Sequence, residues 1–431
     1  MLKPNAIAAA LALTLCSATA GAANWDEMFQ LRSYGTFGFV HSDEDQADFV
    51  NNALLQPEGA GYSDSWSAAV DSKLGLQIDA KFSERLSGVV QLVSESAHNN
   101  SWDGDANEEF TPSLEWANLS YKVSDTVTVR AGRIVLPFMS VAEFRKVGFA
   151  QHWIRPPVDV YGNLGFTSSD GSDVTHRASL GGGVNTARAH FGYHAARLPE
   201  AKVQVKAWGF NDTYEKDAWT VRGSYMRLDF RMVGPGFRPL FDTFASLAEL
   251  FPGGQTAAAS ARQALRHFDP SVAPQSMELY SIGVNYDGGR WFASSELMRT
   301  STDGLFNSST AGYLSAGYRW GAFTPYATFS GLDYSLRTGQ YRIPLDGLPL
   351  PVAGLGAVVN SVIDAYTSTD VSQQTSSLGV RWDFRSNFAL KAQFDHLDLD
   401  RNSYGVFARH QPGFRPGGNA NVFSVAVDYV F

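Results

Sequence analysis

The sequence predicts an all-β protein: a transmembrane antiparallel β-barrel of about sixteen strands. Three observations lead to this prediction. Many segments show apolar and polar residues in alternation. The connections between these segments are in turn short and long, and the chain begins with the pattern of an export signal. A period of two places apolar and polar side chains on opposite faces of a strand, and alternating short and long connections are typical of membrane barrels.

The N-terminus has the pattern of a secretory signal peptide. Lys3 gives a positive start, residues 7–15 are apolar, and small residues within 18–22 offer cleavage sites. The apolar stretch is too short to span a membrane as a helix. We therefore predict a signal peptide at residues 1–22, followed by a single barrel domain at residues 23–431.

The cysteine count limits the chemistry of the exported chain. Cys16 is the only cysteine and lies within the predicted signal. A lipoprotein signal is the alternative, but Leu15 stands where such signals carry a small residue. Removal of the signal would leave no disulfide, no thiolate nucleophile and no zinc-thiolate site. The nine histidines are dispersed and form no metal-ligand pair at helical spacing, so we predict neither metal nor cofactor.

The composition agrees with a barrel and excludes other classes. Aromatic residues make up 13% of the chain, and no later apolar run reaches the roughly 18–20 residues of a membrane-spanning helix. Without Lys3 the chain has 33 basic and 43 acidic residues, a net charge of -10. Proteins that bind nucleic acid usually carry a basic excess, so no nucleic-acid partner is predicted.

The clearest predicted hairpin lies between Asp71 and Leu92. Every second residue from 74 to 82 is apolar and the residues between them are mostly polar. Residues 83–85 form a tight turn, and residues 86–92 return with a similar period. One face of this hairpin is therefore expected to meet lipid and the other to meet water.

The same unit recurs along the chain. Further hairpins or strands are predicted within residues 117–131, 219–225, 280–293, 314–334, 378–394 and 423–431. Longer segments separate them, at residues 41–65, 96–112, 134–171, 231–274, 336–373 and 399–420. The count is about sixteen strands; fourteen or eighteen stay open because the patterns near 172–194, 203–214 and 322–334 are indistinct.

Four short motifs resemble those of Gram-negative porins. They are residues 75–82, 87–92, 129–133 and 429–431, and their order and placement extend the resemblance over most of the chain. Tyr429 and the terminal Phe431 resemble the C-terminal assembly signal that the barrel-assembly machinery binds. The resemblance implies a homotrimer in the lipid of the cell outer membrane.

The third long connection is the candidate constriction loop of the pore. It runs from about Leu136 to Asp170, and the resemblance implies that it folds into the barrel. Irregular backbone at membrane depth must be buried in protein or line a water-filled cavity. The candidate constriction residues are Glu143, Arg145, Lys146, Arg155 and Asp159. The alternative is a surface loop with solvated charges.

The polar faces of the strands predict the pore wall. The basic wall candidates are Lys73, Lys81, Arg130, Arg222, Arg381 and Lys391, and the acidic ones are Asp71, Asp79, Glu296 and Asp395. A charge facing lipid at mid-depth costs roughly 2–4 kcal/mol, so these side chains are expected to face inward. Opposed charges would create a transverse field across the pore. The alternative is that they pair within the wall.

The predicted function is a porin that lets small hydrophilic solutes and ions diffuse passively through a water-filled channel. No hydrolase elbow, phosphate loop, zinc-protease or dinucleotide motif is present, so no enzyme is predicted. The alternatives are a substrate-specific channel for an organic acid, sugar or aromatic compound, a barrel enzyme, and a soluble β-protein. An alanine-rich stretch at 257–267 predicts a helix, either over the pore mouth or on its rim.

Overall fold

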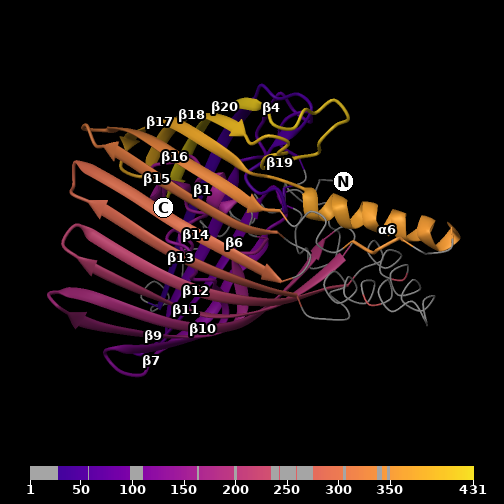
Figure 1. Ribbon diagram of the computed structural model, residues 1–431. Coiled ribbons are helices and arrows are strands. Elements are labelled where there is room, and N and C mark those ends of the chain that lie inside the picture. The colour runs from indigo at the N-terminus through magenta and orange to yellow at the C-terminus, as the bar shows by residue number, and fades with distance from the viewer. Residues whose placement is uncertain are drawn as a thin grey trace, which may run out of the picture.

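The computed structural model shows a closed antiparallel β-barrel with one helix projecting from its end (Figure 1). It describes residues 28–431 except 57, 98–109, 163–164, 199–200, 234–241, 243–258, 260–274, 304–306, 337–341 and 347–349. The predicted signal peptide and the alanine-rich helix at 257–267 therefore fall almost wholly outside the described residues.

Sixteen strands of the described chain build the wall, as the sequence predicts. They are β1 (Phe29–Ser42), β5 (Lys73–Lys81), β6 (Leu86–Glu95), β7 (Ser113–Lys122), β8 (Val127–Val135), β9 (Ser168–Leu180), β10 (Gly183–Leu198), β11 (Ala201–Lys216), β12 (Trp219–Val233), β13 (Gln275–Asp287), β14 (Trp291–Asp303), β15 (Ser308–Tyr318), β16 (Phe323–Ser335), β17 (Gln373–Arg385), β18 (Phe388–Leu399) and β20 (Asn419–Val430). A two-residue strand, β4 (Trp66–Ser67), pairs with the end of β1.

The barrel closes by pairing its first strand with its last. β1 and β20 are antiparallel over nine register pairs, from Tyr34 opposite Val430 to Ser42 opposite Val422. The other edge of β1 pairs with β5, so neither edge is left open. The closed sheet satisfies the backbone groups of every neighbouring pair, as a wall that faces lipid requires.

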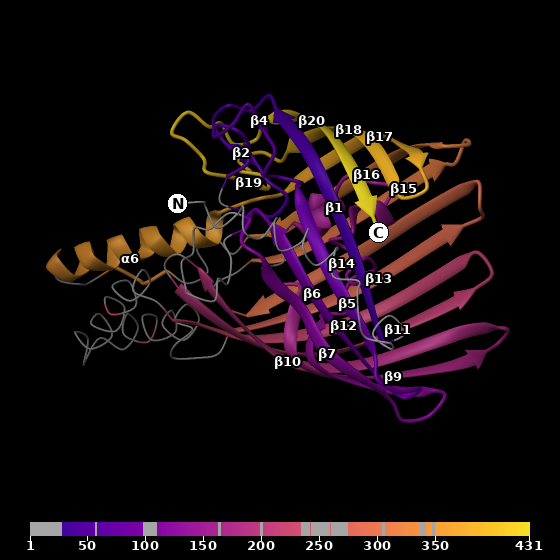
Figure 2. The same ribbon diagram turned by 180° about the vertical axis from the view of Figure 1, so that it is seen from behind.

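The two ends of the barrel differ. Hairpin turns close one end; the β9–β10 turn uses Gly181 and Gly182, whose φ angles of 56° and 83° suit a tight hairpin. The opposite end carries the long connections and α6 (Leu350–Ser368), which projects from it (Figure 1, Figure 2). The sequence predicts a long connection at 336–373, and the structure shows that this connection contains the helix α6.

Among the described residues, no helix combines the length and the apolar character needed to cross a membrane.

The outer face of the wall is apolar. Leu74, Ile78, Leu119, Leu297 and Leu314 are all among its exposed side chains. Near the turn end, aromatic rings pair around the barrel: Trp219 with Tyr286 at 4.8 Å, Trp291 with Tyr318 at 4.7 Å and Phe323 with Trp382 at 5.6 Å between centroids. An apolar band edged by aromatic rings is the surface that a membrane barrel presents to lipid.

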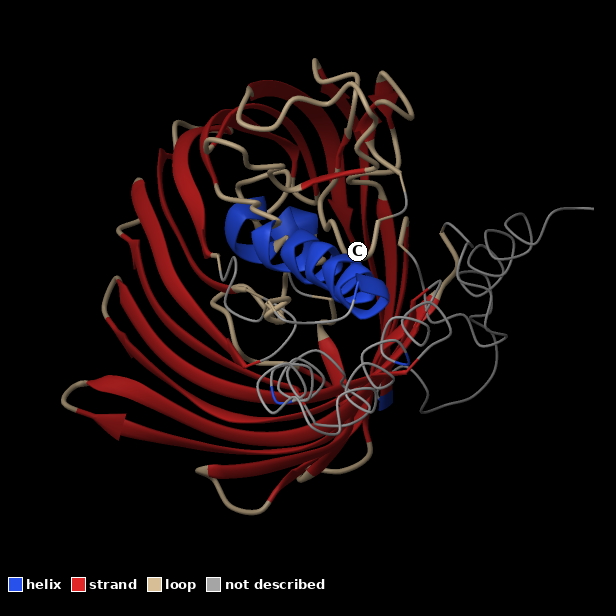
Figure 3. Cartoon of the chain, turned by 45° about the vertical axis from the view of Figure 1, so that its right-hand side comes forward, coloured by secondary structure: helices blue, strands red, loops and turns tan. Residues whose placement is uncertain are grey.

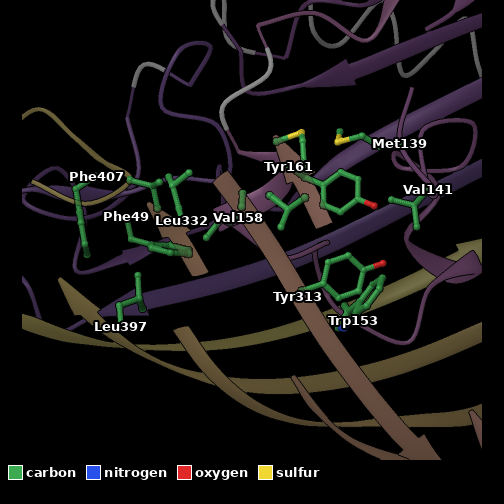
Figure 4. Close-up of a cluster of buried hydrophobic side chains, with 14 of the residues drawn as sticks. Phe49, Met139, Val141, Trp153, Val158, Tyr161, Tyr313, Leu332, Leu397 and Phe407 are labelled. Carbon is green, nitrogen blue, oxygen red and sulfur yellow. The ribbon is translucent and has the colours of Figure 1, made fainter. Parts of the chain in front are cut away.

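A small second sheet covers part of the long-loop end. It joins β2 (Asp48–Phe49) to β3 (Ala60–Gly61) and β19 (Phe407–Ala408). The Phe49 and Phe407 rings meet edge to face at 6.2 Å between centroids, and Figure 4 shows them in the buried cluster. The first and last long connections are thereby held together above the pore.

Candidate pore constriction

Residues 136–167, between β8 and β9, form a loop that enters the lumen, here called the inner loop. Figure 3 shows coil segments inside the ring of strands. The loop ends earlier than the predicted Asp170, because Val135 already pairs with Ser168. Of its described residues, only Glu143, Phe144 and Ala150 are exposed. The prediction that this loop packs within the barrel agrees with this burial.

The first arm of the inner loop packs against β11 and β12. Leu136 lies beside Met226, around a cavity of about 20 Å³. The Pro137 carbonyl oxygen accepts hydrogen bonds from the Asn211 amide (2.9 Å) and the Arg222 guanidinium (2.5 Å). Arg222, a predicted wall residue, therefore faces the lumen and holds the start of the loop.

Glu296 of β14 joins two distant parts of the inner loop. Its carboxylate, 2% exposed, accepts hydrogen bonds from the Ser140 backbone N–H (3.1 Å) and the Tyr161 hydroxyl (2.5 Å). Ser281 on β13 donates a third, at 2.6 Å. In Figure 4 the Tyr161 ring lies among the buried side chains near Tyr313. The wall thereby fixes both arms of the loop at one point.

Lys146 and Arg145 hold the middle of the inner loop. The Lys146 ammonium pairs with Glu95 at 2.6 Å and with Glu115 at 2.9 Å, and Arg145 donates to the Tyr161 carbonyl oxygen at 2.9 Å. Burial alone would lower the pKa of Lys146, but the two carboxylates outweigh it and raise the pKa above its ordinary value. Lys146 is therefore a charged anchor of the loop.

Arg155 is the most heavily bonded residue of the inner loop. Its guanidinium forms a bidentate pair with Asp71 (2.9 and 2.6 Å), a second ion pair with Asp395 (3.0 Å) and a hydrogen bond to Ser424 (2.5 Å). The side chain is 2% exposed. It also lies 5.1 Å from the centroid of the Phe49 ring. Such buried, bidentate pairs are geometrically demanding and strongly position their partners.

Asp159 is buried, and it forms no ion pair with any residue that the structure describes. It lies in the short helix α3 (Val158–Tyr161) and accepts hydrogen bonds from Ser330 (2.5 Å), Gln373 (2.8 Å) and Thr375 (3.1 Å). Burial raises the pKa of its carboxyl. The cavity beside it measures about 20 Å³, enough for about one water molecule.

Two predicted wall cations hold the inner loop from the far side. Lys391, fully buried, donates to the carbonyl oxygens of Gly148 (2.8 Å) and Trp153 (2.7 Å) and pairs with Asp428 (2.7 Å). Arg381 donates to the carbonyl oxygens of residues 149 and 151 at 2.6 and 2.7 Å. Both cations face the lumen as predicted, but they bind loop backbone, not open water.

His152 fits between the inner loop and the wall. Its ring lies 4.5 Å from that of Phe292, and its Nε2 is 3.0 Å from the Ser315 hydroxyl. Burial lowers its pKa to about 3, and the Lys391 and Arg381 cations add to this effect. His152 is therefore neutral at physiological pH.

The side chains of β8, β10 and β12 leave a more open surface, here called the open wall. Arg130 pairs bidentately with Asp173, and Arg188 pairs with Glu143 of the inner loop at 2.5 Å. The Glu143 side chain is 43% exposed and that of Arg130 is 24% exposed. Burial would raise the pKa of Glu143, but Arg188 outweighs it and lowers the pKa below its ordinary value. A carboxylate and two guanidiniums therefore face each other here.

The remaining predicted wall residues also lie on the inward parity of their strands. Lys73 is buried, with Glu95 and Asp71 as neighbouring charges, whereas Lys81 is exposed at the turn end. The sequence reading missed Arg188, because the pattern of its strand is indistinct. Its inward parity on β10 is the signal that could have identified it.

The predicted C-terminal signal lies at the outer, turn-side rim. Phe431 is 61% exposed, and its ring and that of Tyr429 contact Phe388 at 5.5 and 6.2 Å. Within the part of the chain that the structure describes, no group of three acidic, histidine or cysteine side chains could hold a metal ion.

A closed sixteen-stranded barrel whose third long loop is packed in the lumen and faces basic wall residues is the architecture of a porin. No family model matches the chain. Solved structures of outer-membrane porins match the fold of this chain over nearly its whole length.

The anion-selective porin from Comamonas acidovorans superposes with a TM-score of 0.53 at 12% identity, covering 94% of this chain and 99% of that one. The outer membrane channel DcaP of Acinetobacter baumannii gives 0.52 at 11%, covering 94% and 98%. Outer-membrane expressed OmpT of Vibrio cholerae gives 0.50 at 10%, covering 94% and 98%. The chain therefore has the fold of the outer-membrane porins.

A curated protein also matches part of the sequence. The membrane-bound lytic murein transglycosylase F of Shewanella loihica is 28% identical over 109 residues, which cover 25% of this chain. The chain spans only 22% of the length of that relative. So short a match carries no activity to this chain.

Proposed function

We propose that the chain is an outer-membrane porin through which small hydrophilic solutes and ions diffuse passively. The observation that carries the proposal is the contrast within the inner loop. More than half of the loop's described residues are buried and only three are exposed, among them Glu143, which pairs with Arg188 and has Arg130 as a neighbouring charge. A narrow passage bounded by opposite charges admits small polar solutes and orients their dipoles.

The location and partners follow from the same proposal. The signal at residues 1–22 would export the chain, and the strand ending at Tyr429 and Phe431 would engage the barrel-assembly machinery. The apolar, ring-edged wall would contact outer-membrane lipid, and part of it would form the interface of a homotrimer. Metals, cofactors and catalysis have no part in this function.

Single-channel conductance in planar bilayers tests the proposal. The purified chain should give stable, ohmic steps in KCl, and a salt gradient should give a reversal potential that reports the sign of the preferred ion. Folded, heat-modifiable protein that gives no steps would overturn the proposal. A variant lacking the segment Arg145–Arg155, replaced by a glycine-serine linker, should give larger steps and serves as the open-channel control.

A substrate-specific channel is the second candidate, favoured by the tight seating of the inner loop. The cavities beside its buried arms measure about 20 Å³ each, which leaves little open space along them. A specific channel would show saturable block of ion current by one organic acid, sugar or aromatic compound. Equal, non-saturating effects of all such solutes would leave only general diffusion.

A further inference from the structure

A cavity of about 720 Å³ lies against the inner wall at the turn end of the barrel. It is lined by β1, by β5 to β8 and by the turn that joins β5 to β6. No residue of the inner loop lines it, so this cavity is separate from the candidate constriction.

Four inward side chains cross this cavity in one lateral row. Lys81 of β5 pairs in register with Ser87 of β6. Ser87 pairs in turn with Ser120 of β7, and Ser120 pairs with Arg130 of β8. All four line the cavity. Neighbouring strands lie about 4.8 Å apart, so two hydroxyls stand side by side between a lysine and an arginine.

Two charges of the cavity are already neutralised. Arg130 is held by Asp173 on β9, with the shortest contact at 2.6 Å. Asp79, one row above Lys81, pairs with Arg32 of β1 at 3.3 Å. Neither pair leaves a free charge for a solute.

Two ammonium groups remain free. Among the described residues, Lys81 and Lys122 form no side-chain hydrogen bond and no ion pair, and both line the cavity. Lys122 lies two residues beyond Ser120 on the same strand and therefore on the same face. Arg85 and Glu84 of the turn offset each other's charge at the rim. The cavity is thus positively charged in a chain whose net charge is -9.

We propose that this row is a binding site for a small oxyanion, of which inorganic phosphate is the representative. Lys81 and Lys122 supply the positive charge, and the Ser87 and Ser120 hydroxyls donate hydrogen bonds between them. Hydrogen bonds from charged donors to an oxyanion are about twice as strong as neutral ones. The site would hold anionic solutes at the turn-side mouth of the barrel. This role rests on the proposed channel function.

Equilibrium binding of inorganic phosphate to the full-length purified protein tests the site. Titration calorimetry in detergent should show saturable binding, and the Lys81→Gln, Lys122→Gln double variant should bind at least about tenfold more weakly. Lys216→Gln is the matched control, because Lys216 has the same charge at the same end but binds the Gly181 carbonyl oxygen outside the cavity. Its affinity should equal that of the unchanged protein.

Two results would overturn the site: no saturable phosphate binding by the unchanged protein, or equal affinity in the double variant. If the double variant fails to fold, judged by heat-modifiable migration, Ser87→Ala with Ser120→Ala replaces it and should still weaken binding several-fold. Conductance separates this inference from the proposed function. Phosphate binding without channels would overturn only the channel, and channels without phosphate binding would overturn only the site.

Discussion

Two sets of ion pairs hold the inner loop, and they differ in their contact with water. On the packed side, the Arg155, Asp71 and Asp395 side chains are 2%, 1% and 5% exposed. On the open wall, Arg188 and Glu143 are 15% and 43% exposed. Arginine–carboxylate pairs thus fix the loop on the packed side and face the lumen on the open wall. The degree of burial decides which of the two roles a pair has.

The difference has an energetic consequence. Removing one partner of a buried ion pair leaves an uncompensated charge and costs about 3–5 kcal/mol. Removing one partner of a solvated pair changes stability by about 0–1 kcal/mol, because water replaces the lost partner. Mutations on the packed side should therefore act on folding, and mutations on the open wall should act on ion passage.

Arg155→Ala is expected to give the largest effect. It leaves Asp71 and Asp395 buried without their ion-pair partner, so the free energy of unfolding should fall by about 3–5 kcal/mol. Denaturant unfolding of the refolded barrel, followed by tryptophan fluorescence, measures it. In barrels that still fold, the loop is expected to leave the packed side and the single-channel conductance to rise.

Arg319→Ala is the matched control for that prediction. Arg319 pairs with Asp287 at 2.7 Å, but the two side chains are 42% and 59% exposed. Its loss should change the free energy of unfolding by no more than about 1 kcal/mol. Equal effects of the two substitutions would show that burial does not separate the two sets of ion pairs.

His152 should make the packed side sensitive to acid. Its pKa of about 3 in the folded protein lies below the ordinary value of 6.5, so the unfolded state binds more protons between these two values. Stability should therefore fall as the pH is lowered from 6.5 towards 3, with a contribution of about 1–3 kcal/mol from this residue near pH 4.

The measurement is the pH dependence of unfolding in the unchanged protein and in His152→Gln. Glutamine can still bond to Ser315 but does not titrate, so its stability should fall less on acidification. Parallel curves for the two proteins from pH 7 to pH 4 would rule out this role of His152.

The barrel itself could be predicted from the sequence, because most strands show their two faces locally. The period of two in residues 74–82 already distinguishes the lipid face from the lumen face, because Leu74 and Ile78 are exposed on the outer face and Lys73 is buried. The loop that enters the lumen could also be predicted, but from the resemblance to porins, which implies that the third long connection folds into the barrel.

The partners of the loop could not be predicted, because they depend on contacts between distant strands. Arg155 meets Asp71 and Ser424, which lie far from it in the sequence on opposite sides. Lys391 was predicted as a residue lining the pore, yet it is fully buried against the loop backbone. Sequence parity gives the direction of a side chain but not what lies in front of it.

The open wall gives the smallest effect on stability and the clearest effect on ion preference. Glu143→Gln removes the exposed carboxylate and leaves Arg188, Arg130 and Arg222 facing the passage, so the reversal potential in a KCl gradient should shift towards anions. Arg188→Gln should shift it towards cations. Neither should change the free energy of unfolding by more than about 1 kcal/mol.

Since salt screens charges beyond about 10 Å at 0.1 M, both shifts in reversal potential should shrink as the KCl concentration rises. Shifts of the same sign in the two variants would mean that ions do not pass between Glu143 and the open wall.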